Sequence, residues 1–286
     1  MAKFRSWYLL VPAISLLAFI DLVPFFYGLD LSFQRWIMTS PNPSTYVGFF
    51  NYRFLVNDSE FLGAFVRGVT FAAISIACQV LLGLGTAFIM LRKFRGNLAF
   101  KVILTLPLAV APIAVGSMWR IMMYPGIGPI PYYLEQLLGI NWDMTASSAI
   151  ALATTIMMDT WHWLPLAALI LLSGIAGIPQ GVLESAAMDG VNVLQKLRFI
   201  YVPLIRFEIL LVVLLRGMDA FRIFDEIWML TGGGPGDTTR FLSVSLYTLI
   251  LRGWDIGYGA AISMVYLYVI VVMCWILYQA VMRVRQ

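Results

Sequence analysis

Five charged residues recur every three or four positions in an otherwise apolar stretch near the C-terminal third of the chain. They are Arg216, Asp219, Arg222, Asp225 and Glu226. This spacing places the side chains along one side of a helix, with the two signs alternating. Within a membrane a charged group costs about 3 kcal/mol unless it is paired or faces protein or water. Structural pairing explains Arg216 and Asp219 as well as a functional role does.

A second group of polar and aromatic residues lies in another apolar stretch. It consists of Asp159, Trp161, His162 and Trp163. Carboxylates and indoles together suit a ligand with hydroxyl edges and apolar faces. His162 is the only histidine in the chain, so it cannot be half of a histidine-based metal site. We interpret it as a histidine that is satisfied by a structural hydrogen bond.

A third polar stretch, "ESAAMDGVNVLQKLRFIYVP" at residues 184–203, predicts a helix, a sharp elbow and a second helix. Pro179 suits the first position of a helix, and Gly190 can adopt the left-handed conformation that ends one. Asn192 and Gln195 have the spacing of a capping box, and Pro203 would break the second helix.

Small and acidic residues flank this elbow. Ser185, Ala186 and Ala187 would let another surface approach the backbone closely, while Glu184 and Asp189 would present negative charge to it. Two interpretations remain open from the residues alone: a docking site for another protein, or an amphipathic helix pair lying on the lipid surface.

The composition places these groups in a membrane protein. Of the 286 residues 61% are hydrophobic and 12% are charged, and the mean hydropathy is +0.86. Such a chain has too little polar surface to cover a soluble globule, and a spanning helix needs about 20 apolar residues. Six windows meet this requirement, at residues 7–27, 64–91, 102–123, 149–175, 207–230 and 257–282. We therefore expect one all-helical transmembrane domain over residues 1–286.

Basic residues near the ends of these windows predict the orientation. With the N-terminus inside, the inner side holds Lys3, Arg5, Arg92, Lys93, Arg95, Lys101, Lys196, Arg198, Arg206, Arg283 and Arg285, and the outer side holds Arg35, Arg53, Arg67, Arg240 and Arg252. Both termini and the elbow are then cytoplasmic. The net charge of +4 reflects this orientation, and no basic stripe with interleaved aromatics indicates a nucleic-acid partner.

The elbow resembles a known motif at matching spacing. Its pattern of Glu184, Ala186, Asp189, Gly190, Ile200 and Pro203 is similar to the EAA loop (EAAxxDGAxxxxxFxxIxxP) of permease subunits in binding-protein-dependent ABC importers. Ser185, Val191 and Leu197 depart from that pattern by small or apolar replacements. These departures put partner preference in doubt, and leave the assignment intact.

A second resemblance narrows the family. The stretch "DAFRIFDEIWMLTGGGPGDTT", at residues 219–239, is similar to the end of the fifth helix and the following loop in carbohydrate importers of the maltose, lactose and glycerol-3-phosphate type. It resembles the permease of each pair that carries the Gly-Gly-Gly-Pro loop. Together with the six windows, the likeness covers nearly the whole chain.

The family implies a fold, partners and a location. The fold is that of a type I importer permease, with six transmembrane helices and a cytoplasmic coupling helix within residues 179–203. The partners are a second, different permease, two copies of an ATPase subunit, a solute-binding protein and membrane lipid. The implied location is the bacterial inner membrane.

The resemblance also implies roles for residues. The ATPase-coupling residues would be Glu184, Ser185, Ala186, Asp189, Gly190, Leu197 and Pro203. We expect the path of a sugar-like solute to be lined by Arg222, Phe224, Asp225 and Trp228, with Asp159, Trp161 and Trp163. The chain has no GxxxxGK[ST] motif, so we expect it to be no enzyme and to hold no cofactor, with ATP and Mg²⁺ bound by the partner ATPase subunits.

Two other classes of protein compete with an importer permease. An ion-driven secondary transporter would use intramembrane carboxylates as coupling sites, but it leaves the elbow unexplained, and the windows show no inverted repeat. A membrane-embedded enzyme would need a catalytic cluster, and the sequence has no HExxH, no GxSxG and no paired Cys/His set. The identity of the solute does not follow from the sequence.

Overall fold

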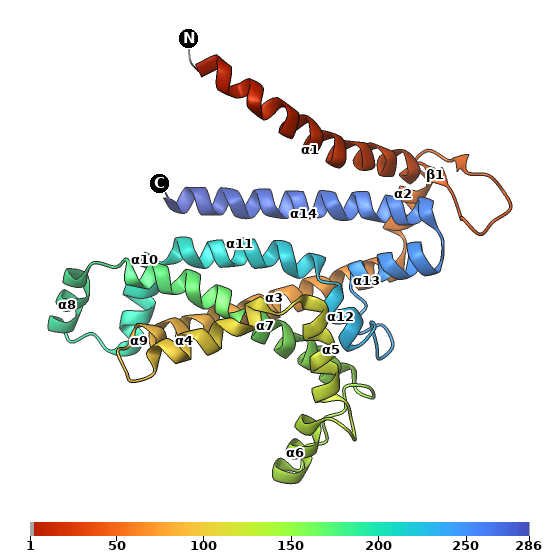
Figure 1. Ribbon diagram of the computed structural model, residues 1–286. Helices are drawn as coiled ribbons and strands as arrows, with labels where there is room; N and C mark the ends of the chain where they lie inside the picture. The colour runs from red at the N-terminus through yellow and green to blue at the C-terminus, as the bar shows by residue number, and fades with distance from the viewer. Residues whose placement is uncertain (1–2, 286) are drawn as a thin grey trace. The chain divides into compact units, whose positions relative to one another are not determined.

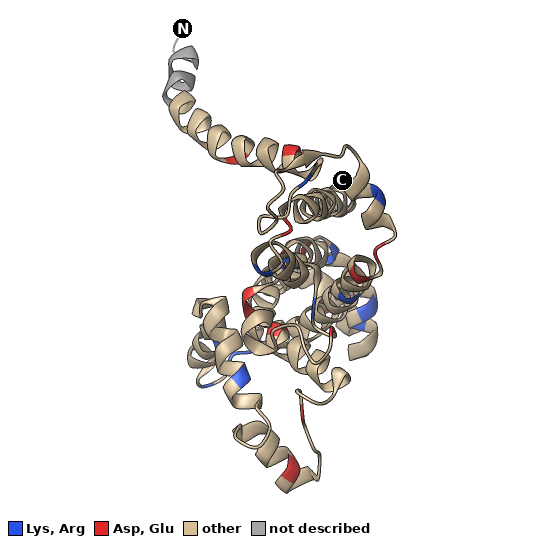
Figure 2. Cartoon of the chain, turned by 90° about the vertical axis from the view of Figure 1, so that its right-hand side faces the viewer, with Lys and Arg blue, Asp and Glu red and all other residues tan. Residues whose placement is uncertain are grey.

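A computed structural model describes residues 3–285, which are mostly helical (Figure 1). The chain divides into two compact units. The first unit comprises Met1–Leu62 and Ser245–Val269, and the second comprises Gly63–Val244 and Ile270–Gln286. Charged residues are sparse along the ribbons, as expected for a chain in which 12% of residues are charged (Figure 2).

The first unit contains a long helix, a small hairpin and shorter helical segments. Its elements are α1 (Lys3–Ser32), β1 (Gln34–Arg35), β2 (Thr45–Tyr46), α2 (Phe50–Val56), the π-helical turn η3 (Thr248–Arg252) and the first part of α14 (Ile256–Arg285). The strands pair antiparallel. The buried Asn51 amide donates to the carbonyl oxygens of Ser32 and Gln34, each at 2.9 Å, and so fixes α2 against the end of α1.

The second unit contains the remaining elements and the polar groups of interest. They are most of α3 (Ser59–Leu91), α4 (Asn97–Thr105), η1 (Leu106–Ala109), α5 (Pro112–Met123), α6 (Pro129–Leu138), α7 (Ser148–Ala176), α8 (Gln180–Met188), α9 (Val193–Lys196), η2 (Leu197–Tyr201), α10 (Val202–Leu204), α11 (Arg206–Arg222), α12 (Asp225–Leu230), the start of α13 (Leu242–Tyr247) and the end of α14.

Two apolar clusters hold the second unit together. One contains Phe71, Val115, Met158 and Ala220 among its members, and the other contains Leu84, Ala167, Leu171 and Val212. Both clusters draw on α3, α7 and α11, so each of these three helices passes from one cluster to the other along its length.

Four of the six predicted windows are continuous helices. Within the described residues, α1, α3, α7 and α14 are long and apolar enough to cross a membrane, and a fifth crossing results if a bent helix pair counts as one span. These helices extend a few residues beyond the predicted windows at one or both ends. The total of six crossings stays a prediction.

The predicted continuous helix at residues 102–123 is wrong, because the chain bends there. The segments on either side, Asn97–Ala109 and Pro112–Met123, meet at 104°. Val110 and Ala111 have extended backbones, with ψ of 132° and 139°, and Pro112 begins α5. Proline disfavours the helical conformation in the residue before it and suits the first helical position, so the break falls at this point.

The predicted helix at residues 207–230 is also interrupted. It ends at Arg222 and restarts as α12, because Ile223 is extended with ψ of 122°. Asp225 and Glu226 occupy the first turn of α12, where negative charge is stabilised by the helix dipole. Gly116 allows α5 to approach closely: a β-carbon there would lie 2.5 Å from the Glu226 carbonyl oxygen. Helices α6 and α13 lie outside the six predicted windows.

Candidate functional site: a buried charge network and an exposed elbow

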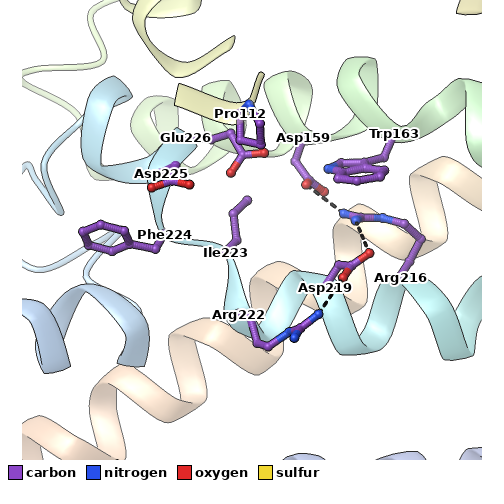
Figure 3. A pocket seen from close by; sticks show the side chains of 10 residues that line it. All are labelled: Pro112, Asp159, Trp163, Arg216, Asp219, Arg222, Ile223, Phe224, Asp225 and Glu226. Atoms are coloured by element: carbon purple, nitrogen blue, oxygen red, sulfur yellow. Dashed lines mark hydrogen bonds and ion pairs between the residues drawn. The ribbon is translucent and has the colours of Figure 1, made fainter. Parts of the chain in front are cut away.

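Arg216 is the centre of a closed hydrogen-bond network in the second unit. Its Nη2 donates to Asp159 Oδ1 at 2.8 Å, and its Nε donates to Gln79 Oε1 at 2.9 Å. The Gln79 amide in turn donates to Asp159 Oδ2 at 2.8 Å. Only 1% of the Arg216 side chain is exposed, and its guanidinium lies 4.4 Å from the centre of the Trp163 ring. The guanidinium therefore combines an ion pair with Asp159 and a cation–π contact with Trp163, both drawn in Figure 3, with a neutral hydrogen bond to Gln79.

The network lies where the two apolar clusters meet. On α3 Gln79 falls between residues of the two clusters, as does Asp159 on α7 and Arg216 on α11. Each helix thus contributes one polar group at the same level. A buried charge without a partner is strongly destabilising, so the three groups depend on one another for their burial.

Asp219 extends this network toward solvent. One of its carboxylate oxygens lies 3.7 Å from Arg216 Nη1, and the other accepts a hydrogen bond from Arg222 Nη2 at 3.1 Å. The Arg222 side chain is 65% exposed. Arg216 pairs with Asp219, which is one of the two interpretations that the sequence left open, although Asp159 on another helix is the nearer partner. Arg222 pairs with Asp219, and the described residues show no ion pair between Arg222 and Asp225.

His162 is satisfied by a partner, as predicted. Its Nδ1 lies 3.2 Å from Glu226 Oε1, and both side chains are buried. Because Glu226 belongs to α12, this contact fixes the first turn of α12 against α7. The sequence analysis grouped Glu226 with the charged residues of window 207–230 and did not predict its contact with His162.

A cavity of about 330 Å³ opens beside the network (Figure 3). It is lined by Pro112, Asp159, Trp163, Arg216, Asp219, Arg222, Ile223, Phe224, Asp225 and Glu226. The break between α11 and α12 forms part of its wall, since Ile223 and Phe224 lie at that break. Asp225 is exposed and differs from the other carboxylates: across residues 3–285 no hydrogen bond or ion pair involves its side chain.

Five of the seven predicted path residues line this cavity. They are Asp159, Trp163, Arg222, Phe224 and Asp225. Trp161 lies elsewhere, with its ring centre 6.0 Å from that of Trp119. Trp228 stacks on Phe224, with ring centres 5.9 Å apart and planes at 16°, and lies behind that lining residue.

The elbow adopts the predicted left-handed turn and capping box, but its two prolines differ from the prediction. Gly190 has a left-handed backbone, with φ of +69°. Asn192 caps α9 through the predicted capping box. Its Oδ1 accepts a hydrogen bond from the backbone N–H of Gln195 at 2.8 Å, and Gln195 Oε1 accepts one from the backbone N–H of Asn192 at 2.9 Å. Pro179 precedes α8 and is not its first residue. Pro203 does not break the helix as predicted: helical backbone continues through the π-helical turn η2 to Leu204, and Pro203 lies in the first turn of α10, where proline is tolerated.

The surface of the elbow is both apolar and acidic. Ala186 is buried, whereas Glu184, Ser185, Asp189, Gly190 and Pro203 are exposed. Leu183, Leu197 and Tyr201 pack against the second apolar cluster. Several other large apolar side chains are exposed, and three of them stand out: Met188 is 83% exposed, Val193 85% and Leu194 73%.

Comparison with known proteins identifies the family. No protein-family model matches the sequence. The chain is 30% identical over 264 residues to the trehalose transport system permease protein of Mycobacterium tuberculosis, an alignment that covers 92% of this chain and 84% of that protein. The chain belongs to the permease subunits of carbohydrate ABC importers.

Solved structures share the permease fold. A bacterial ABC transporter that imports the acidic polysaccharide alginate matches with a TM-score of 0.80 and 20% identity, over 99% of this chain and 97% of that chain. The alginate transporter in complex with its alginate pentasaccharide-bound periplasmic protein matches with a TM-score of 0.78 and 20% identity, over 96% and 93%.

Proposed function

We propose that the permease forms half of the translocation path for a sugar or sugar-like solute. The cavity beside Arg216 offers the chemistry that such a solute needs, with an unpaired carboxylate at Asp225 and aromatic rings at Trp163 and Phe224. Hydroxyl groups bind to carboxylate acceptors, and the apolar faces of sugar rings pack on aromatic side chains. The similar permease of M. tuberculosis is named for trehalose, which is consistent with this class of solute.

The predicted path residues fall into two groups: those whose side chains are already bonded within the protein, and those that can contact a solute. Asp159 is committed to Arg216 and Gln79, so we assign it to the wall of the path as a structural group. Asp225 and Phe224 line the same cavity, next to the break between α11 and α12, and we assign solute contact to them. We place Arg222 at the margin of the cavity. Trp228 supports Phe224 by stacking on it.

The elbow would couple the permease to separate ATPase subunits, and its exposed surface is the observation that supports this best. A segment that only capped its own unit would not expose Met188, Val193 and Leu194 next to Glu184 and Asp189. Large apolar side chains rimmed by polar ones are typical of protein contacts. ATP and Mg²⁺ would be bound by the ATPase subunits, whose closure would move the elbow as a rigid body.

The full complex would contain a second, different permease, two ATPase copies and a binding protein for the solute. The permease would cross the bacterial inner membrane six times, with α4 and α5 as one bent crossing and α11 with α12 as an interrupted one. Both termini and the elbow would be cytoplasmic. The binding protein in the similar alginate transporter complex is consistent with this assembly.

The coupling role is tested by replacing one glycine of the elbow and comparing it with another. Gly190→Val places a β-branched residue at φ +69°, which costs about 1–2 kcal/mol or more, and should therefore displace α8 relative to α9. Gly181→Val is the matched control, because Gly181 lies in α8 and nothing lies within 4 Å of its β-carbon position. We expect ATPase co-purification to fall in Gly190→Val and to persist in Gly181→Val.

Glu184→Lys provides an independent test of the same surface, since it reverses an exposed charge without straining the backbone. It should weaken ATPase association while leaving membrane insertion intact. Wild-type yield of the ATPase and unchanged solute-stimulated hydrolysis in both Gly190→Val and Glu184→Lys would contradict the coupling role.

A further inference from the structure

A second hollow in this unit has a different chemistry from the solute cavity. It measures about 790 Å³ and lies at the end of α3, the start of α4 and the last turns of α7. It is lined by Met90, Leu91, Arg92, Lys93, Phe94, Arg95, Asn97, Lys101, Leu172 and Ala176. Four of these ten residues are basic and none is acidic.

The connection that forms the hollow is held in a defined shape. The Asn97 amide donates to the carbonyl oxygens of Met90, at 3.2 Å, and of Arg92, and so ties the start of α4 to the end of α3. Gly96 turns the chain with a left-handed backbone, at φ of +90°. The ring of Phe94 packs edge-on against that of Phe100, with ring centres 6.0 Å apart. The basic side chains are therefore presented from a closed turn.

The basic charges are not neutralised by the protein itself. Within residues 3–285, the side chains of Arg92, Lys93, Arg95 and Lys101 take part in no ion pair. Every arginine of the solute cavity, by contrast, pairs with a carboxylate. Four uncompensated cations around one hollow favour an anionic ligand.

The rest of the surroundings is apolar. Leu91, Leu172 and Ala176 line the hollow, and α4 continues from it with Leu98, Val102 and Ile103 exposed. An apolar helix that carries no charge on its exposed side and continues from a basic turn is suited to contact with acyl chains. The hollow thus offers cations beside a hydrocarbon-facing surface, which is the combination that an anionic amphiphile requires.

We propose that this hollow binds the headgroup of an anionic phospholipid, whose phosphate contacts Arg92, Lys93, Arg95 and Lys101 and whose acyl chains lie along α4. Basic pockets at the membrane boundary between helices recognise anionic lipid headgroups in this way. The site is separate from the solute cavity and does not depend on the proposed transport function.

The test measures retention of phosphatidylglycerol by the purified full-length permease, with phosphatidylcholine as the neutral probe. Native mass spectrometry counts bound lipids, and a lipid titration of thermal unfolding in detergent reports affinity. Arg92→Gln/Arg95→Gln should lower the apparent affinity for phosphatidylglycerol about tenfold or more, because each basic residue near an anionic surface contributes separately. Binding of phosphatidylcholine should not change.

The matched control removes two basic residues outside the hollow. Arg198→Gln/Arg283→Gln makes the same charge change at exposed positions, and should retain phosphatidylglycerol at the wild-type affinity. Asn97→Ala keeps all four charges but releases the turn, and should lower the affinity to an intermediate degree.

Three outcomes would overturn the proposal. The first is an equal loss of phosphatidylglycerol in the two double variants, which would indicate only nonspecific charge. The second is equal stabilisation of the wild-type permease by inorganic phosphate, which would show that the acyl chains do not contribute. The third is unchanged lipid retention in Arg92→Gln/Arg95→Gln together with loss of the ATPase subunit, which would assign the hollow to a protein partner.

Discussion

The network around Arg216 and the elbow around Gly190 differ in where their side chains find partners. The network finds them within the chain, whereas the elbow leaves large side chains exposed. Arg216 and Asp159 are buried charges that bond to each other and share Gln79, while Arg216 Nη1 has no hydrogen bond and lies 3.7 Å from Asp219. In the elbow the backbone is satisfied by its own capping box, while Val193 and Leu194 are left exposed. A buried charge must find its partner within the fold, whereas exposed apolar side chains favour contact with another surface. The network is thus a scaffold, and the elbow is suited to an external partner.

The largest effect should come from removing one charge of the scaffold. Arg216→Met leaves the Asp159 carboxylate buried without its cation, which costs about 3–5 kcal/mol of unfolding free energy. Arg222→Met is the matched control on the same helix, because Arg222 is exposed and its pair with Asp219 should contribute less than about 1 kcal/mol. Unfolding in detergent by titration with dodecyl sulfate measures both.

A double variant sharpens this prediction. Arg216→Met/Asp159→Leu removes both charges and should recover part of the lost stability, although Gln79 then loses both side-chain partners and keeps only its 3.3 Å bond to the main-chain carbonyl oxygen of residue 159. If Arg216→Met were no more destabilising than Arg222→Met, the distinction between scaffold and exposed surface would fail for this network.

The cavity beside Arg216, which we propose as part of the solute path, combines both behaviours, and Asp225 is the residue that separates them. Asp225→Ala removes a carboxylate that has no side-chain partner among the described residues, so the fold should lose only the helix-dipole contribution of about 0.3–1 kcal/mol, while solute interaction weakens by about 1–3 kcal/mol. Uptake into proteoliposomes should fall accordingly, with complex assembly and basal ATPase activity retained.

The alternative role for Asp225 is to compensate the charge of Arg222 and not to contact the solute. Arg222→Ala/Asp225→Ala should transport as poorly as Asp225→Ala, because the structure pairs Arg222 with Asp219. Uptake restored in the double variant would show that the two side chains compensate each other, and would move Asp225 from the path to the scaffold.

The same contrast explains which features the sequence could predict. The turn at Gly190 and the box of Asn192 with Gln195 depend on residues within a few positions, and both were predicted. The Arg216 network joins residues 57 and 137 positions apart, so no local pattern could pair them. The only signal for Gln79 was an amide in an apolar window.

Hydropathy also could not locate the breaks in the helices. Ile223 and Phe224 are as apolar as a continuous span requires, yet the backbone is extended at Ile223. Pro112 gave a usable signal for the bend before α5, since proline restricts the residue that precedes it. The break between α11 and α12 has a weaker signal, the acidic pair that begins α12.

The smallest effect that we expect is on ATPase association when one exposed apolar residue of the elbow is replaced. This variant tests whether the elbow contacts a protein or lipid. Leu194 is 73% exposed, so Leu194→Ser should change the unfolding free energy by less than about 0.5 kcal/mol. If Leu194 contacts an ATPase subunit, the same change should weaken association by on the order of 1 kcal/mol, about five- to tenfold. Leu183→Ser is the matched control in the same elbow, because Leu183 packs against the apolar cluster and its loss should destabilise the fold instead. Full ATPase association in Leu194→Ser would contradict a protein contact at Leu194 and would favour contact of this apolar surface with lipid.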